Sequence, residues 1–408
     1  MDAVHAQNTS VLSRRLHDDW CFHKNHRNSR YLGGWLCGQP CLLSRSYPET
    51  HPSDLLRIHW QSSIKFSRSF LLCDLCVLCS EPLLREPLLF RVNSIPHTQP
   101  AHWPSEMPAS RFAAHIQQAM PTACKVAILG LPDDFGVRLN HGRPGASQGP
   151  RAFRDALAKY GAAHPASGPL PRVFDAGDVI PASETAADAL GETHKRVTTA
   201  TRALLDVGLF PIAIGGGHDL TFAFARGVLE HLREKIMPKR TAATAPHVLY
   251  FDAHLDVRDT PGSGMPFRRI VEDCGVRSLA VVGAKPSVNS AEHAAYFTKV
   301  GGAVVVSQAQ AVPAGATDVL VSLDLDVLDA AHAPGVSAMN PAGMSSASVE
   351  SWIAWCGAHP LVRCFDIMEL NPVHDENGRT ARLAAHMFYT FLQGLAKRPG
   401  FAYTGGML

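Results

Sequence analysis

The chain has 408 residues, of which 46% are apolar and 18% are charged, and its formal net charge at pH 7 is +2. This balance is typical of a globular protein with a large core, and it excludes a polybasic nucleic-acid surface as the main feature. No apolar run reaches the roughly 18 residues of a membrane-spanning helix, and the N-terminus lacks the apolar centre of a signal peptide, so we expect a cytoplasmic protein that binds neither nucleic acid nor membrane.

Residues 1–115 differ in character from the remainder and are predicted to be an N-terminal extension of uncertain structure. They show little sustained helical or strand periodicity and end in a stretch that contains Pro96, Pro100, Pro104 and Pro108. Proline-punctuated segments of this kind are typical of linkers. We expect the extension to be poorly ordered, and it can be upstream sequence if Met107 or Met120 is the true start.

One motif in the extension has the spacing of a metal site. Cys73, Cys76 and Cys79 lie three residues apart, and thiolates at this spacing can hold zinc or an iron–sulfur cluster. The residues around them are apolar, however, and no fourth ligand stands at a suitable spacing. Buried, inert thiols and a thiolate metal module both stay open as interpretations. Since cytosolic disulfides are rare, we expect the chain's ten cysteines to be free.

Residues 116–408 are predicted to form one catalytic domain. From Cys124 onward, short and mostly unbroken apolar runs alternate with segments of helical period, which is typical of strands buried on both faces of a parallel sheet. The predicted strands are 125–131, 211–215, 247–252, 278–283, 303–307, 319–324 and 362–366. The predicted helices are 149–160, 186–207, 220–234, 290–300, 346–356 and 380–396. This alternation predicts an α/β domain whose ligands bind at the carboxyl ends of the strands.

Three of the predicted strands end in acidic residues and histidines. After the first of them, Gly215, Gly216 and Gly217 permit a tight turn that leaves His218 at the mouth of the strand. On its own, a histidine in this position is more often a hydrogen-bonded loop residue than a ligand.

The other two clusters consist of alternating ligand-type residues. Asp252, His254 and Asp256 are spaced by two, and an extended backbone would place all three on one face. Asp324 and Asp326 repeat this spacing at the end of a later apolar run. Carboxylates so close together raise one another's pKa unless a cation neutralises them. A solvated edge strand is the alternative for the first cluster, but the apolar run before it argues against that interpretation.

Together the clusters supply two imidazoles and four carboxylates. Oxygen-rich ligands with some imidazole suit Mn²⁺ better than zinc. Six ligands are too many for one catalytic ion with an open position, and they fit two ions about 3.5–4 Å apart. The predicted chemistry is therefore metal-assisted hydrolysis.

Four motifs together resemble those of the ureohydrolases, the family of arginase, agmatinase and formimidoylglutamase. They are Gly-Gly-Gly-His at 215–218, Asp-Ala-His-Leu-Asp at 252–256, Ser-Leu-Asp-Leu-Asp at 322–326 and Asp-Ile-Met-Glu-Leu-Asn-Pro at 366–372. The similarity covers about residues 124–398 and includes a glycine-rich loop at 140–150. It implies a three-layer α/β/α sandwich around a mainly parallel sheet, two Mn²⁺ ions per chain and a homo-oligomer, either a trimer or a hexamer.

The resemblance also implies roles for individual residues. One manganese would be held by His218, Asp252, Asp256 and Asp324, and the other by His254, Asp252, Asp324 and Asp326. Asp256 would hydrogen-bond the attacking hydroxide and pass its proton to the leaving amine. Glu369 would hold the cationic –NH₂ group of the substrate in a charge-assisted pair. The alternative for Glu369 is a structural acid that precedes the turn at Asn371.

Two departures from the family pattern bear on the substrate. Ser263 stands where arginases and agmatinases carry a proton-shuttling histidine, and its surroundings resemble formimidoylglutamase. Arg258 stands where arginase has an asparagine that contacts a substrate carboxylate, and arginine suits bidentate recognition of a carboxylate. An ion pair with Asp256 or Asp259 is the alternative for Arg258, and Arg268 is a second candidate for the carboxylate contact.

We therefore predict a formimidoylglutamase-like enzyme of histidine degradation, which converts N-formimidoyl-L-glutamate and water to L-glutamate and formamide. The alternatives are a guanidino-acid hydrolase, or an agmatinase-like or arginase-like enzyme, all of which release urea. A non-catalytic protein that keeps the fold for binding is a further class, and the complete set of six ligands argues against it.

Overall fold

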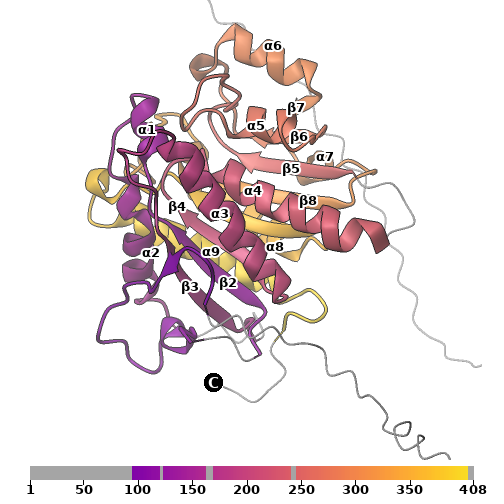
Figure 1. Ribbon diagram of the computed structural model, residues 1–408. Coiled ribbons are helices and arrows are strands. Elements are labelled where there is room, and N and C mark those ends of the chain that lie inside the picture. Colours follow the sequence, from indigo (N-terminus) through magenta and orange to yellow (C-terminus); the bar gives the residue numbers. More distant parts are fainter. Residues whose placement is uncertain (1–93, 120–122, 162–168, 240–244, 403–408) are drawn as a thin grey trace, which may run out of the picture. The chain divides into compact units, whose positions relative to one another are not determined.

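The computed structural model describes residues 94–119, 123–161, 169–239 and 245–402. Within these ranges the chain folds around a nine-stranded sheet, shown in Figure 1. The strands are β1 (Thr98–Gln99), β2 (Val126–Leu131), β3 (Val173–Val179), β4 (Phe210–Gly215), β5 (Pro246–Phe251), β6 (Leu279–Val282), β7 (Gly302–Val304), β8 (Asp318–Asp324) and β9 (Val362–Met368). Their spatial order is β1-β3-β2-β4-β9-β8-β5-β6-β7. Only the β1–β3 pair is antiparallel within the described sheet, so the prediction of a mainly parallel sheet is confirmed.

Helices cover both faces of this sheet (Figure 1). They are α1 (Phe135–Leu139), α2 (Gly149–Leu157), α3 (Ala189–Asp206), α4 (Leu220–His231), α5 (Pro266–Glu272), α6 (Ala291–Lys299), α7 (Gln308–Ala311), α8 (Ser346–Ala358) and α9 (Arg379–Leu395). The pair α3 and α4 lies on one face, and α8 and α9 lie on the other, which confirms the three-layer sandwich. Among the described residues, no helix combines the length and apolar character that a bilayer-spanning segment needs.

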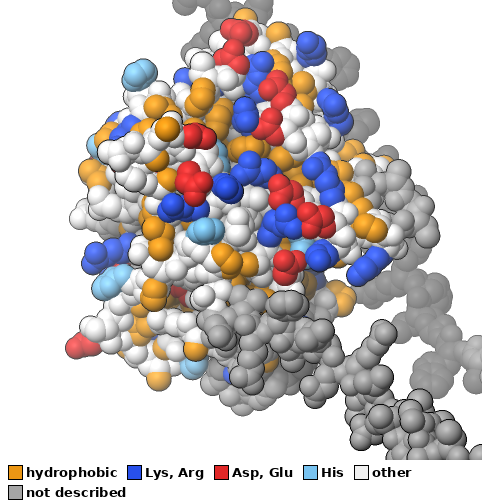
Figure 2. Space-filling view, in the orientation of Figure 1, with side chains coloured by type: hydrophobic (Ala, Val, Ile, Leu, Met, Phe, Trp, Pro, Cys, Tyr) orange, Lys and Arg blue, Asp and Glu red, His pale blue; other side chains and the backbone are white. Residues whose placement is uncertain are grey.

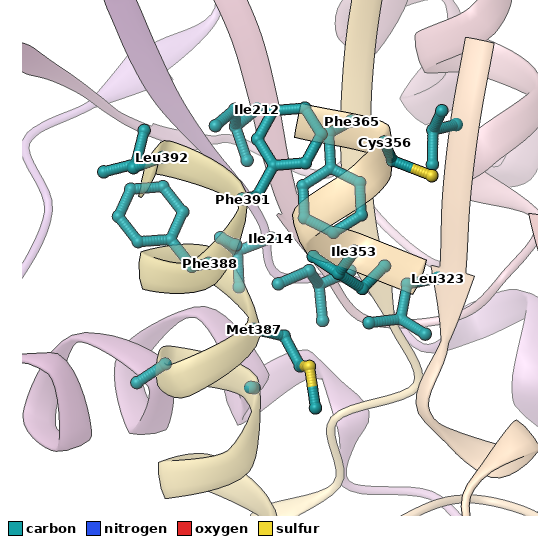
Figure 3. Packing of buried hydrophobic residues seen from close by; sticks show 14 of the residues in the cluster. Ile212, Ile214, Leu323, Ile353, Cys356, Phe365, Met387, Phe388, Phe391 and Leu392 are labelled. Carbon is teal, nitrogen blue, oxygen red and sulfur yellow. The ribbon is translucent and has the colours of Figure 1, made fainter. Parts of the chain in front are cut away.

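A hydrophobic core lies on each face of the sheet. Figure 3 shows the core beneath α8 and α9, where side chains of β4, β8 and β9 pack against both helices. Phe365 of β9 stacks on Phe391 of α9, with ring centroids 4.3 Å apart. The second core contains Val228 and Leu229 of α4, both fully buried. Because both faces are covered, the central strands are apolar at nearly every position, which is why unbroken apolar runs predicted them.

Three strands differ from the sequence-based prediction, and the first of them is β1, which lies in the extension where no strand was expected. β3 was missed because Asp175, Gly177 and Asp178 interrupt its apolar pattern. These acids are tolerated because Arg154 of α2, itself buried, pairs with both, at 2.8 Å from Asp175 and 2.6 Å from Asp178. The strand predicted at 303–307 is shorter, and Val304 is 58% exposed because β7 lies at the edge of the sheet.

The chain segment 94–119 packs against the sheet. β1 pairs with β3 and covers the edge that β3 would otherwise expose. The indole Nε1 of Trp103 donates a hydrogen bond of 2.7 Å to Asp175, and Phe112 and Ile116 are buried in the core beneath α9. Residues 94–115 of the predicted extension are therefore ordered, contrary to the expectation. They donate a hydrogen bond to the buried Asp175 carboxylate and fill part of the core.

The remainder of the predicted extension, including Cys73, Cys76 and Cys79, lies outside the described residues. The domain boundary at residue 116 stays a prediction. Because Ile95 and Trp103 are already buried, we now expect the folded unit to include the described residues that precede residue 116.

We predict that Trp103→Phe lowers the free energy of unfolding. The phenyl ring keeps most of the packing but removes the indole N–H from the Asp175 carboxylate, which retains its pair with Arg154. The loss of one hydrogen bond to a charged group costs about 1.5–3 kcal/mol. Urea unfolding followed by circular dichroism measures the change. Trp355→Phe is the matched control, because no hydrogen bond from the Trp355 indole to a described residue is formed. Equal losses in both variants would show that the hydrogen bond to Asp175 is unimportant.

Candidate functional site

The predicted ligands lie at one edge of the sheet, at the carboxyl ends of four strands. In spatial order these strands are β4, β9, β8 and β5, and they are consecutive neighbours. His218 follows β4, Glu369 follows β9, Asp324 is the last residue of β8 and Asp252 follows β5. Parallel pairing therefore brings side chains together that are far apart in sequence.

The structure brings all six predicted metal ligands into two overlapping groups. The first contains His218, Asp252, Asp256 and Asp324, and the second contains Asp252, His254 and Asp326. Within each group, one potential ligand atom from every residue lies within 4.8 Å of the others. Asp252 belongs to both groups, so its carboxylate is placed to serve two ions.

Both imidazoles direct Nδ1 at the carboxylates. Nδ1 of His218 lies 2.9 Å from Asp256, 3.1 Å from Asp324 and 3.2 Å from Asp252. Nδ1 of His254 lies 2.9 Å from Asp326 and 3.3 Å from Asp252. Each nitrogen thus faces oxygens with which it could share a cation.

Turns, not an extended backbone, produce this convergence, so that expectation was wrong. β5 ends at Phe251, and the Asp252 carboxylate accepts a hydrogen bond of 2.6 Å from the backbone N–H of His254. Asp324 accepts one of 2.8 Å from the N–H of Asp326 in the same way. Asp256 has φ +46°, a left-handed conformation that is unusual for a residue other than glycine. These turns use one carboxylate oxygen for the backbone and leave the other for a ligand.

A buried side-chain pair orients His218. Ser322 Oγ lies 3.0 Å from His218 Nε2 and donates a hydrogen bond of 2.6 Å to Asp366. Since the hydroxyl proton goes to Asp366, the oxygen accepts from Nε2–H, and the lone pair of a neutral imidazole is left on Nδ1. Burial raises the pKa of Asp366 to about 7. The sequence analysis did not identify this role of Ser322 and Asp366, although both residues stand in motifs that carry the family resemblance.

Glu369 supports the loop that carries His218. Its backbone N–H donates to Gly216 O at 2.8 Å, and its Oε1 accepts from the backbone N–H of His218 at 2.8 Å. The second oxygen is buried near Ser337 but makes no hydrogen bond of normal geometry with the described residues. Burial raises the pKa of Glu369 to about 8. Glu369 is therefore structural through one oxygen and available to a cationic ligand through the other.

Asn289 supports the loop between Asp252 and Asp256. Its Oδ1 accepts from the N–H of Leu255 at 2.8 Å, and its Nδ2 donates to the carbonyl of Ala253 at 3.0 Å. From sequence its role was unresolved, because only its place beyond the end of a strand was visible. The structure assigns it to the loop, where both of its amide atoms are used.

The electrostatics of the cluster call for positive charge. Burial, together with the nearby Asp256 and Asp326, raises the pKa of Asp252 to about 6. Burial and the same kind of repulsion raise the pKa of Asp324 well above its usual range. The buried Oδ2 of Asp252 accepts no hydrogen bond of normal geometry from a described residue. These buried carboxylates repel one another, and imidazoles lie beside them. Together they form a donor set that fits divalent cations.

Protonated histidines supply part of this positive charge. Burial alone would lower the pKa of His254, but the Asp326 and Asp252 carboxylates raise it to about 12. His218 is likewise buried, and Asp324, Asp252 and Asp256 raise its pKa well above the usual value. Both shifts favour the protonated imidazoles while no cation is bound.

The two predicted substrate contacts meet at a third residue. Arg258 donates from Nη1 to Asn140 Oδ1 at 2.5 Å, and Ser263 Oγ accepts from Asn140 Nδ2 at 3.2 Å. Among the described residues no carboxylate pairs with Arg258, so its alternative ion pair with Asp256 or Asp259 is not formed. Sequence reasoning did not single out Asn140.

Arg268, the second candidate for a carboxylate contact, is engaged elsewhere. It pairs with Glu272 at 3.0 Å and lies over the ring of Tyr296 at 4.3 Å.

A cavity of about 1090 Å³ runs along α3 and α4 but contains none of the six ligands. Acidic and basic side chains alternate on this face, as Figure 2 shows. Arg202 pairs there with Glu230 at 2.9 Å and also with Glu234. His194 lines the cavity and binds Asp219, the neighbour of His218. Through this hydrogen bond, α3 supports the loop that carries His218.

The profile of the Arginase family matches residues 124–393. Formimidoylglutamase of Aromatoleum aromaticum is 36% identical over 298 residues, which cover 67% of this chain and 84% of that protein. The enzyme of the same name from Ralstonia nicotianae is 34% identical, with 68% and 87% covered. The crystal structure of Trypanosoma cruzi formiminoglutamase with Mn²⁺ is similar with a TM-score of 0.62 and 29% identity, over 72% of this chain and 100% of that one.

We predict that binding of divalent cations releases protons from this cluster. The nearby carboxylates raise the pKa values of His218 and His254 and so favour their protonated forms while no cation is bound, and a cation must displace these protons, so protons should leave when it binds. The affinity for Mn²⁺ should accordingly increase as the pH is raised. It should decrease more steeply below about pH 6, where Asp252 also binds a proton. Calorimetric titration with Mn²⁺ in buffers of different ionisation enthalpy measures the release.

His386→Ala is the control for this titration, since His386 pairs with Glu350 at 3.0 Å and is not one of the six ligands. It should release as many protons as the unaltered chain. Identical heats in all buffers would mean that the imidazoles are neutral before the cation binds.

Proposed function

The chain belongs to the arginase family and is a hydrolase of amidine C–N bonds, and from that premise we propose that its substrate is N-formimidoyl-L-glutamate. The products would be L-glutamate and formamide. The convergence of six metal-ligand side chains at the ends of adjacent strands carries this proposal. The names of the similar proteins support the choice of substrate, and so does an arginine near the ligands that no described carboxylate neutralises.

We assign two Mn²⁺ ions to the cluster. One would be held by His218, Asp252, Asp256 and Asp324, and the other by His254, Asp252, Asp324 and Asp326. In this structure Asp324 belongs to the first group, and Asp252 is the residue that both groups share. When bound, such a metal pair supplies Lewis-acid chemistry and lowers the pKa of water to near neutral. The oxygen-rich donor set favours manganese over zinc.

Asp256 and Glu369 would act on the reacting atoms. Asp256 would take a proton from the attacking water and deliver it to the leaving nitrogen, so that glutamate departs as an amine. Glu369 would accept a hydrogen bond from the amidinium –NH₂ through its free oxygen. The arriving cation would keep this buried carboxylate ionised despite its raised pKa, and the low local dielectric strengthens the pair.

Arg258 and Ser263 would select the substrate. The guanidinium of Arg258 retains N–H groups beyond the one that Asn140 uses, and these can bind a carboxylate in bidentate geometry. Ser263 is small and neutral, so it would leave space beside that carboxylate and would not shuttle protons as a histidine can. An acidic guanidine would satisfy Arg258 equally well, which keeps a guanidino-acid hydrolase as the second candidate.

We further propose that the enzyme acts in histidine degradation in the cytoplasm. The cysteines of the described part are unpaired and buried, as expected in a reducing compartment, namely Cys124, Cys274, Cys356 and Cys364. A homo-oligomer, either a trimer or a hexamer, rests on the family resemblance alone.

We predict that Asp324→Asn lowers kcat more than about 100-fold and weakens Mn²⁺ binding, because an amide removes both a charge and a ligand from the buried cluster. Steady-state kinetics with a manganese titration measure both effects. Asp329→Asn is the control just beyond the motif, since Asp329 accepts a hydrogen bond from the N–H of Ala331 in a turn. Full activity of Asp324→Asn would contradict the metal assignment.

The substrate is tested by turnover of the manganese-loaded full chain. Formimidoylglutamate, arginine, agmatine and 4-guanidinobutyrate are supplied separately, and glutamate, formamide and urea are quantified. Glutamate and formamide from the first substrate alone are expected. Urea from a guanidino acid instead would retain the metal assignment and overturn the assignment of the substrate.

A further inference from the structure

Asn140 joins the segment after α1 to the loop between β5 and α5, which carries both proposed specificity residues. It is the residue that ends α1, and its side chain reaches Arg258 and Ser263, which lie 118 and 123 positions away in sequence. Its carbonyl oxygen accepts from the guanidinium at 2.5 Å, and its amide nitrogen donates to the serine hydroxyl at 3.2 Å. One short side chain thus fixes the relative position of two others.

The backbone around these side chains is closed by further hydrogen bonds. The N–H of Arg258 donates to Gly264 O at 2.9 Å, and the N–H of Ser263 donates to Gly136 O at 2.9 Å. A Cβ on Gly264 would lie 2.9 Å from Cδ and Nε of Arg258. The glycine therefore allows the loop to close directly on the stem of the arginine side chain, while Asn140 holds one nitrogen of the guanidinium.

The identity of the atoms determines which way the amide of Asn140 points. A guanidinium only donates hydrogen bonds, so the oxygen of Asn140 must face Arg258 and the nitrogen must face Ser263. The amide orients the arginine without neutralising it. Since no described carboxylate pairs with Arg258, its full charge stays available to a ligand.

We propose that Asn140 is a positioning residue for specificity, which holds the Arg258 guanidinium in place to receive a carboxylate of the substrate. This inference rests on the proposed function of Arg258 and deepens it. Asparagine is suited to the task because alanine would release the guanidinium and aspartate would occupy it. The proposal distinguishes Asn140 from a residue that only stabilises the loop, because its effect must depend on the charge of the substrate.

The test compares Asn140→Ala and Asn140→Asp with the unaltered enzyme, all loaded with manganese. The substrates are formimidoylglutamate and N-propylformamidine, which has the same reacting group but no carboxylate. Asn140→Ala should raise KM for formimidoylglutamate about tenfold and change kcat little, as expected for loss of a hydrogen bond to a charged group. Asn140→Asp is isosteric, yet it should raise KM at least as much, because its carboxylate pairs with Arg258. Neither variant should alter kcat/KM for N-propylformamidine.

A double-mutant cycle with Arg258→Ala tests whether Asn140 acts through Arg258. In the Arg258→Ala background, Asn140→Ala should have no further effect on KM for formimidoylglutamate. Arg268→Ala is the matched control for removal of a nearby cation, and it should leave KM unchanged because Arg268 pairs with Glu272. Thermal unfolding of each variant identifies any that fail to fold, and Asn140→Asp, which keeps the shape of asparagine, then carries the test.

Several results would overturn the proposal. Equal losses with both substrates would mean a structural role, independent effects in the cycle would mean that Asn140 does not act through Arg258, and an unchanged KM in Asn140→Asp would exclude the positioning role. Failure of the proposed substrate is distinguishable, because the unaltered enzyme would then not convert formimidoylglutamate. If it released urea from 4-guanidinobutyrate instead, the same variants would be assayed with that acid, which also carries a carboxylate.

Discussion

Four carboxylates and two imidazoles share a small, largely buried volume at one edge of the sheet, and the mutual repulsion of the carboxylates is the constraint on which the rest of the site depends. Asp252 is fully buried, and its nearest charged neighbours are other carboxylates and the two histidines. In a medium of low dielectric constant such a group must bind protons or cations. The raised pKa values of His218 and His254 are the response of the cluster when protons are the available positive charge.

The surrounding structure holds this arrangement through many weak constraints. Ser322 and Asp366 fix one imidazole, while Asn289 fixes the loop between the ligands of β5. Asp256 and Glu369 both have positive φ values, +46° and +64°, at a cost of about 1 kcal/mol or more each. Hydrogen bonds from neighbouring loops hold such conformations, and in return each carboxylate reaches a position that regular backbone would not give it.

Much of the fold and the convergence of the six candidate ligands could be predicted because their signals are local. The apolar runs predicted β2, β4, β5, β6, β8 and β9, and each ligand stands within a few residues of a strand end. β3 could not be predicted because its acids are satisfied by Arg154, and the order of segment 94–115 could not because Trp103 binds Asp175 across 72 positions. Asn140 was missed for the same reason. Hydrogen-bond partners distant in sequence leave no periodic pattern, and only the tertiary structure reveals them.

The place of β9 in the sheet has a consequence for biosynthesis. β9 follows the other eight described strands in the chain, yet it lies between β4 and β8 and hydrogen-bonds to both. A nascent chain that has not yet released β9 from the ribosome cannot complete the centre of the sheet, so His218 and Asp324 have no fixed separation until that strand is inserted. The ligand cluster is therefore assembled late, by long-range contacts of high entropic cost. Metal capture can then mark the completion of folding rather than its start, and a prematurely terminated chain would lack the geometry to retain the ions.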